Sequence, residues 1–548
     1  MKGRGVNPGR SSTRRAGHSD RVLGGVLCAV LVLGGACARS ENDGQELLEL
    51  EQALTCPASA TDVNVARDLL ITDVSLVDHV RAKSWSGIAS SDITDGTFHF
   101  GRLMNDLRGR DGNQQDPNGG ADITYTPYEL SEYVHRWLDE WETDDVTNCD
   151  QVPGRPAVNT HIRDPWPKIA GQYDVYTTKD GRNVTRERLD MRNPPFRLLA
   201  VVFRNDLADL TPPRGHDAAN DPQRDPPQAG ELRIVYGLIN PATGAAKNLT
   251  VAFEYSLPAQ SENDVTLWHK RWRGEVDGTT VGSTEWLNGV SRLVWEVTRN
   301  NGARNATSSL YAGNPCLGCG QARPHDNNLH QLRTNDYKVL GATQEFREFR
   351  VPLNPPAKNR GGAPNHFYMN MTFRRKFQNE VKLAKYFDSY CEHILAEHHK
   401  VPQDFPQKLG DPKVDGCEVL EPNSVQAGAS YNDFSLWWNA PVSDYATCGN
   451  ATKNEVRHRF SRNTCNGCHG VEMGFRTDSA ANNFMIRPRA EGVASTLSPF
   501  ISLGTWSVQD PKDPTLTRDF TELLSRRTKY RNVLCNGYTQ PAYPTTWR

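Results

Sequence analysis

Short runs of β-branched and aromatic residues, separated by polar turn sequences, occupy the middle of the chain and predict strands. Three clear runs lie at residues 196–203, 231–239 and 249–257. The second and third are separated by the sequence NPATG at residues 240–244, which favours an antiparallel hairpin. Further strands are predicted at three places: residues 68–74, 328–335 and 343–351.

Apolar residues recur at helical spacing outside these runs. The segments concerned are residues 128–141, 265–273, 286–297 and 377–399. The first should bury the face that carries Trp137 and Trp141, and the second and third are expected to cover the sheet. Strands in the middle, helices before and after, and no regular strand–helix alternation predict an α+β fold with an antiparallel-sheet central domain and flanking helices.

The composition narrows the class of protein. The chain has 548 residues, enough for about two to four domains. Its mean hydropathy of -0.65 excludes a multispanning membrane protein. The formal net charge is -2, so no global positive field exists to bind nucleic acid.

The first forty residues have the layout of an export signal. Basic residues precede an apolar run at residues 22–36, which is long enough for a signal-peptide core and short for a membrane span. Residues 1–37 are therefore interpreted as a signal peptide. Small residues precede Cys37, as in lipoprotein signals that are cut before a lipidated cysteine, and the alternative is an ordinary cleavage site around Ala36, Cys37 and Ala38. Residues 38–61 form a polar linker, and the folded body is expected outside the cytoplasm.

An exported protein can keep disulfides, and eight of the 12 cysteines are left once the signal, Cys37 and a motif at 465–468 are set aside. Eight cysteines allow about 105 pairings. Chain order suggests four bridges: Cys56–Cys149, Cys316–Cys319, Cys391–Cys417 and Cys448–Cys535. The Cys316–Cys319 pair lies in a Gly/Pro-rich loop, and a structural disulfide is favoured there over a redox pair or half a zinc site.

The sequence TCNGCH at residues 464–469 contains CxxCH, the attachment signature of a c-type haem. Two thiols about one helical turn apart, Cys465 and Cys468, can each add to a haem vinyl group. The adjacent His469 can then reach the iron from the same face. The alternative is a disulfide or zinc half-site with a neighbouring histidine.

A second axial ligand is expected on the opposite haem face. Met485 lies sixteen residues downstream of His469, far enough for the chain to turn back over the ring, and His458 is the alternative. Core packing beside Phe484 is the competing role for Met485. Arg487 and Arg489 could pair the haem propionates, because a guanidinium fork matches a carboxylate, and they are equally consistent with surface charges.

Several segments together resemble a group of uncharacterised exported bacterial proteins, often lipoproteins, that end in a CNGCH segment. The segments are LLITD at 69–73, PFRLLAVV at 195–202, GELRIVYG at 230–237, FEY at 253–255, LRTN at 332–335 and TCNGCH at 464–469. That group often continues Phe-x-His-x-x-Pro-Arg after the motif, and when this chain's FMIRPR at 484–489 is aligned on the final Pro-Arg, methionine takes the place of histidine. Because both residues ligate haem, the resemblance favours position 485 as the distal ligand.

We therefore expect a small, mostly helical, cytochrome-c-like C-terminal module with one covalently attached haem c. The expected parts are a helix-rich N-terminal domain at 62–194, a β-rich central domain at 195–360, a helical connecting region at 361–460 and the haem module at 461–548. The corresponding function is electron transfer by a membrane-anchored envelope protein with a redox partner protein, and without nucleic acid or an identifiable small-molecule substrate. The alternative is a non-catalytic envelope lipoprotein with a ligand-binding or structural role, in which CxxCH is only a structural element.

Overall fold

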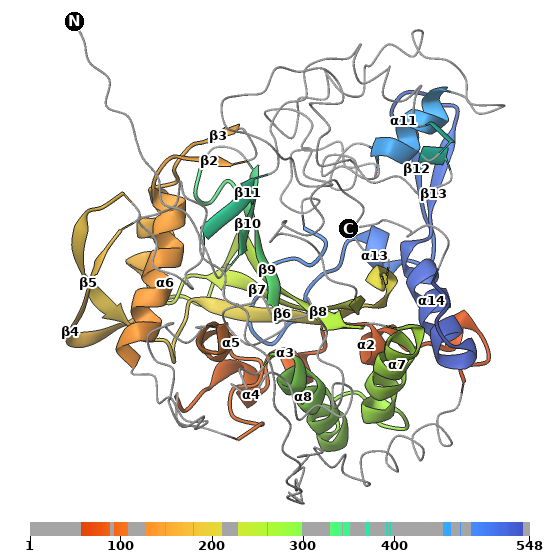
Figure 1. The fold of residues 1–548 in the computed structure, drawn as a ribbon, viewed down its shortest axis with the longest axis horizontal. Coiled ribbons are helices and arrows are strands. Elements are labelled where there is room, and N and C mark those ends of the chain that lie inside the picture. The colour runs from red at the N-terminus through yellow and green to blue at the C-terminus, as the bar shows by residue number, and fades with distance from the viewer. Residues whose placement is uncertain are drawn as a thin grey trace, which may run out of the picture.

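The computed structural model describes residues 56–87, 92–107, 127–147, 150–178, 180–210, 228–259, 261–298, 329–341, 344–350, 368–372, 391–392, 394–395, 453–461, 472 and 484–540. Within these ranges the protein is an α+β structure built on a seven-stranded antiparallel sheet (Figure 1). The strand order is β1-β6-β7-β8-β9-β10-β11. The strands are β1 (Leu70–Ile71), β6 (Phe196–Arg204), β7 (Gln228–Ile239), β8 (Ala246–Pro258), β9 (Leu329–Tyr337), β10 (Gln344–Arg350) and β11 (Tyr368–Thr372).

Most of the predicted strands and helices are confirmed. The hairpin of β7 and β8 has the expected turn, and β6, β9 and β10 extend it on both sides in antiparallel register. The predicted helices correspond to α6 (Pro127–Glu142), α7 (Glu262–Val276) and α8 (Thr284–Thr298). Of the helix predicted at 377–399, residues 391–392 and 394–395 are described and are helical.

The prediction of a strand at residues 68–74 is mostly wrong. Only β1 is extended there, between the short helices α2 (Val65–Asp68) and α3 (Val74–Val77). The side chains of Asn64 and Asp73 accept hydrogen bonds from backbone N–H groups of the following turns and so cap the two helices. The capping residues outweighed the strand propensity of the apolar run.

A further set of elements was not predicted individually from the sequence. Near the N-terminal end they are η1 (Ala60–Asp62), α4 (Val80–Lys83), α5 (Phe100–Leu107), β2 (Asp145–Thr147), β3 (Asp150–Val152), the π-helix η2 (Asn159–Arg163), β4 (Lys168–Thr177), β5 (Asn183–Leu189) and η3 (Asn205–Leu207). The later ones are α11 (Lys453–Ser461), α13 (Pro499–Ser502), β12 (Trp506–Gln509), β13 (Thr517–Phe520) and α14 (Glu522–Asn536). The pairs β2–β3, β4–β5 and β12–β13 are separate two-stranded sheets.

One face of the sheet carries the main hydrophobic core. Strands β7 and β8 present alternate residues such as Tyr236 and Phe253 to this face, where they meet Phe100 of α5. Trp137 of α6 and Trp268 of α7 belong to the same core. The helices α3, α5, α7 and α8 lie on one side of the sheet, below it in Figure 1. The core is continuous across the domain boundary expected at residue 195.

The opposite face of the sheet is partly apolar and partly ionic. Ala200 and Val202 of β6 pack against the C-terminal residues Phe500, Ile501 and Phe520. Farther along the same face, a chain of ion pairs crosses four strands. Its members are Glu231, Arg233, Glu254, Arg333 and Glu348, with N–O separations from 2.7 to 3.5 Å. The pairing compensates the buried carboxylates, which would otherwise be costly on a sheet face.

The C-terminal helix α14 is part of the main body. Its Tyr530 and Val533 belong to the main core, and its Cys535 forms a disulfide with Cys56. The predicted pairings Cys56–Cys149 and Cys448–Cys535 are therefore wrong. Chain order failed because α14 returns to the N-terminal residues of the body, a tertiary contact that order along the chain does not encode. Cys391 is also disulfide-bonded, and the other cysteines of the suggested pairings lie outside the described residues.

Candidate functional site

The residues of the CxxCH motif, Cys465, Cys468 and His469, lie outside the described residues, as does Cys37. The sequence on either side of the motif is described. Helix α11 precedes it and ends at Ser461, and Glu472 follows it. These flanking residues, together with residues 484–498, are the parts of the predicted haem site that the structure describes.

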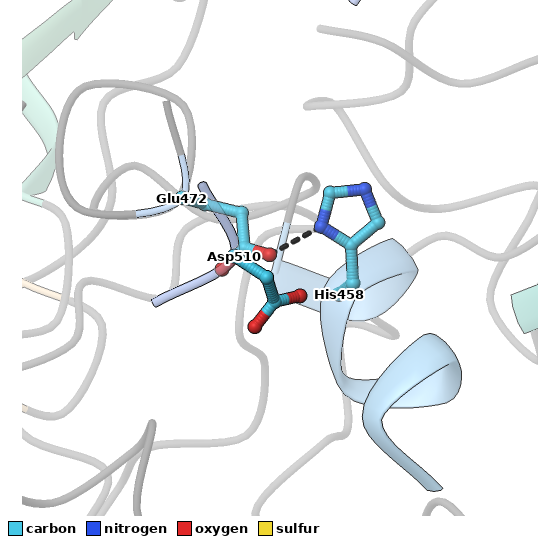
Figure 2. A group of neighbouring side chains, drawn as sticks. All are labelled: His458, Glu472 and Asp510. Atoms are coloured by element: carbon cyan, nitrogen blue, oxygen red, sulfur yellow. Dashed lines mark hydrogen bonds and ion pairs between the residues drawn. The ribbon is translucent and has the colours of Figure 1, made fainter. Parts of the chain in front are cut away.

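The two flanks of the motif are bonded to each other through Glu472. Arg457 of α11 donates from its two terminal nitrogens to the two carboxylate oxygens of Glu472, at 2.7 and 3.1 Å. The adjacent His458 donates from Nδ1 to the same carboxylate (Figure 2). Glu472 is completely buried. Glu472, three residues beyond the motif, is thereby tied to the helix that precedes the motif.

Asp510 extends this arrangement to the C-terminal hairpin. Its carboxylate accepts hydrogen bonds from Arg457 at 3.2 Å and from Nε of Arg518 at 2.7 Å. It also accepts from the backbone N–H groups of Lys512 and Asp513, at 2.8 and 3.0 Å. These bonds join α11 to β13 and to the turn between β12 and β13. We call Arg457, His458, Glu472, Asp510 and Arg518 the flank network.

Both carboxylates of the flank network are held ionised. Burial alone would raise the pKa of Asp510, but the charge of Arg457 and hydrogen bonds from Arg518 and the backbone lower the pKa to about 2. Burial also opposes ionisation of Glu472, and the bond from His458 with the charge of Arg457 keeps its pKa below the ordinary value. The network is therefore a set of compensated charges.

The flank network also contains a set of potential metal ligands. One nitrogen of His458 and one oxygen each of Glu472 and Asp510 lie within 4.8 Å of one another, and all three residues are buried (Figure 2). Such N/O donors suit a divalent cation. However, both carboxylates already bind Arg457, and Asp510 also binds Arg518. A divalent cation would meet two guanidinium charges at close range, so we interpret the group as an ion-pair network.

Met485, the predicted distal ligand, is held in a short antiparallel pairing with Ser498. Residues Ile486 and Leu497 form an isolated β-bridge. The Ser498 N–H donates to the Met485 carbonyl at 2.9 Å, and the Ser498 hydroxyl donates to Sδ of Met485 at 3.3 Å. The thioether is thus fixed by one hydrogen bond to the sulfur. A second lone pair remains on that atom.

The side chain of Met485 is half-buried against the apolar cluster of Ala200, Val202, Phe500 and Phe520. Phe520 of β13 also contacts the flank network, because the centroids of its ring and of the His458 ring lie 5.8 Å apart. Phe520 therefore connects the cluster that holds Met485 with the histidine that is bonded to Glu472. The packing role that competed with ligation for Met485 in the sequence is present as well.

Arg489 and Arg487, the predicted propionate partners, differ in their surroundings. Arg489 is buried and donates to both carboxylate oxygens of Asp78, at 3.0 and 2.9 Å, and to the carbonyls of Val77 and Leu198. A propionate would have to replace these bonds. In contrast, Nε of Arg487 is buried and has no hydrogen-bond partner in the described part of the chain. An orphaned guanidinium donor suits an anionic group, so Arg487 fits a propionate and Arg489 serves as a structural anchor.

Sequence reasoning missed Ser498 and every member of the flank network except His458, which it named as the alternative distal ligand. Glu472 follows His469 by three residues, but its partners Arg457 and Asp510 are far apart in the chain and carry no shared motif. Ser498 precedes Pro499, a common start of a helix, and so would be assigned to a cap. Only the tertiary structure places its hydroxyl on a sulfur.

Comparison of the chain with protein-family models, with curated proteins and with solved structures gives no match. Among the helices of the described ranges, none combines the length and hydrophobicity that a membrane span requires. A cytochrome-c-like module is not visible in the described C-terminal residues, which contain the hairpin β12–β13 and the helices α13 and α14.

Proposed function

We propose that this chain is an exported protein that carries one covalently attached haem c and transfers single electrons. The proposal rests on a chain of contacts between a residue that follows the CxxCH motif and the cluster that holds Met485. Glu472, three residues after His469, is bonded to His458, and His458 contacts Phe520 of the cluster against which Met485 packs. The segment that would bind haem and a thioether that can ligate iron are thus connected through three side chains.

Each residue of the proposed site has a distinct role. Cys465 and Cys468 would add their S–H bonds across the two vinyl groups, which requires no leaving group, and His469 would be the proximal ligand. Met485 would be the distal ligand, and Arg487 would pair a propionate. Bound haem supplies a one-electron couple: one electron enters from a reduced partner protein and leaves to an oxidised one, and no atom is transferred.

The proposed location outside the cytoplasm is supported by the N-terminal sequence. Residues 1–37 would direct export, and lipidation of Cys37 would anchor the body to a membrane surface. Haem of the c type is generally attached outside the cytoplasm, so export and the CxxCH motif support each other. The alternative remains an envelope lipoprotein with a ligand-binding or structural role and no haem.

The test is to express the full chain with cytochrome maturation machinery and to stain for haem after denaturing electrophoresis. We expect the wild type to retain haem at one per chain, because thioether bonds survive denaturation. The variant Cys465→Ala with Cys468→Ala should lose the stain completely.

The chain offers a matched control in its other CxxC sequence. The variant Cys316→Ala with Cys319→Ala removes two thiols at the same spacing but without a following histidine, and it should keep its haem. A wild-type protein without haem under these conditions would overturn the proposal and leave the envelope lipoprotein. Equal loss of haem in both double variants would show a folding defect and would also count against a specific attachment site.

A further inference from the structure

Ser498 stands at the N-cap of α13, but its hydroxyl does not cap the helix. A serine at this position normally accepts a hydrogen bond from a backbone N–H of the first turn. Here the side chain makes no capping bond, and the hydroxyl donates to Sδ of Met485 instead, at 3.3 Å. The hydroxyl therefore does not stabilise the helix as a cap, and it bonds to a thioether sulfur, which is a weak hydrogen-bond acceptor.

The surroundings make this contact specific. Ser498 is 1% exposed, so water does not compete strongly for its hydroxyl. Its backbone N–H donates to the Met485 carbonyl at 2.9 Å, so the same residue holds both the backbone and the sulfur of Met485. Methionine has three rotatable side-chain bonds, and a fixed donor on the sulfur limits the orientations of the remaining lone pair.

A hydrogen bond to a ligating sulfur has an electronic effect as well as a geometric one. The donor withdraws electron density from the thioether, which weakens its donation to ferric iron more than to ferrous iron. Hydrogen bonding around the axial ligand is one of the means by which a protein sets a haem reduction potential. The Ser498 hydroxyl would therefore favour the reduced form.

We propose that Ser498 is a positioning residue that orients the Met485 thioether as the distal haem ligand and raises the reduction potential of the site. The inference rests on the proposed function and goes beyond it, because it assigns the control of the potential to a residue outside the haem-binding motif. The observation behind this inference is that Ser498, at an N-cap position, directs its hydroxyl to the one thioether expected to bind iron and not to the helix.

The test uses the full-length, haem-loaded protein and compares Ser498→Ala with the wild type in an equilibrium redox titration. Loss of one weak hydrogen bond should shift the reduced-to-oxidised ratio about two- to tenfold toward the oxidised form at a fixed solution potential. The weak far-red charge-transfer band of a His/Met-ligated ferric haem should diminish. Ser498→Thr, which keeps a hydroxyl, should restore much of both signals.

Ser502→Ala is the matched control, because the Ser502 hydroxyl donates to the Ser498 carbonyl at 2.9 Å and makes no hydrogen bond to Met485 among the described contacts. It should leave the redox equilibrium and the far-red band unchanged. A merely structural role for Ser498 would lower thermal stability without moving either signal, and that result would overturn the inference while haem content stayed intact. Met485→Ala with an unchanged far-red band would overturn it as well, whereas a wild type without haem would overturn the proposed function itself.

Discussion

At the scale of single residues, Arg489 shows how one side chain joins distant parts of the chain. Its guanidinium group is buried, with 2% of the side chain exposed, and it pairs with Asp78. It also donates to the carbonyls of Val77 and Leu198, so it connects residues near α3, strand β6 and the segment that carries Met485. The geometry of the proposed distal ligand therefore depends on this anchor.

Arg489→Ala should destabilise the folded chain by about 3–5 kcal/mol, because the Asp78 carboxylate loses its partner in a mostly buried place. The control is Arg192→Ala, since the Arg192 side chain is 61% exposed and pairs with Asp190 at the surface. The control should cost less than about 1 kcal/mol. Urea unfolding followed by tryptophan fluorescence measures both, and equal small losses would contradict the anchoring role.

The chemistry of individual residues was only partly readable from the sequence. The spacing of Cys465, Cys468 and His469 predicts haem attachment by itself, because the three side chains are neighbours in the chain. The partners of Arg489 could not be predicted, since Asp78 lies 411 residues away. Ion pairs of this kind depend on the completed fold.

At the scale of elements, prediction succeeded for helices and strands that bury one face, because their apolar residues recur at a regular spacing in the sequence. Helices α6, α7 and α8 each bury one face, and the strands β7 and β8 alternate between the core and the opposite face, so their patterns are strong. The hairpin β4–β5 was missed because most of β4 is exposed, which leaves no apolar alternation to read. Exposed strands are paired by backbone hydrogen bonds, and their side chains show only a weak apolar pattern in the sequence.

The flank network makes the pairing of α11 with the hairpin β12–β13 sensitive to acid. The pKa of Asp510 is lowered from 3.8 to about 2 in the folded chain, so its stabilising contribution is complete above about pH 4. As the pH falls toward 2, the carboxylate takes up a proton and the contribution is lost. At pH 6 the free energy of unfolding of the wild type should exceed that of Asp510→Asn by on the order of 2 kcal/mol. This difference in stability should shrink toward zero at pH 2.

Hydrogen exchange of the β12 and β13 amides between pH 2 and pH 6 checks this expectation, after correction for the intrinsic exchange rate. The control is Asp519→Asn, because Asp519 is an exposed residue of β13 that bonds only to Ser507 among the contacts described for it. This control should follow the wild type at every pH. A difference between wild type and Asp510→Asn that does not change with pH would contradict the assigned cause.

At the scale of the whole molecule, the disulfide between Cys56 and Cys535 holds the first described residues of the body against its last long helix. Arg531 of α14 supports the same contact by donating to the carbonyls of Pro57 and Ala58, at 2.8 and 3.0 Å. The main core accordingly contains residues from both ends of the described body, among them Val63 and Val533. Residues of the expected N-terminal and central domains both belong to this core, a contact that periodicity along the chain does not reveal.

Replacement of both cysteines by alanine should lower the free energy of unfolding by about 2–5 kcal/mol, because the bond restricts an unfolded chain over a sequence separation of 479 residues. Peptide mapping of the unreduced wild type should recover a single linked pair of peptides that contain Cys56 and Cys535. In reducing buffer the difference between variant and wild type should vanish. Recovery of Cys56 linked to Cys149 would contradict this pairing.

The long separation of the bonded cysteines also has a consequence for biosynthesis. At about 5–20 residues per second, the ribosome needs roughly half a minute to a minute and a half to make the chain between the two thiols. When export is coupled to synthesis, Cys56 is in an oxidising compartment throughout that time and must avoid nearer competitors such as Cys149. Correct oxidation is thus a late event that waits for the carboxyl-terminal helix, and a thiol–disulfide isomerase acting on early mispaired forms should govern the yield of correctly bonded protein.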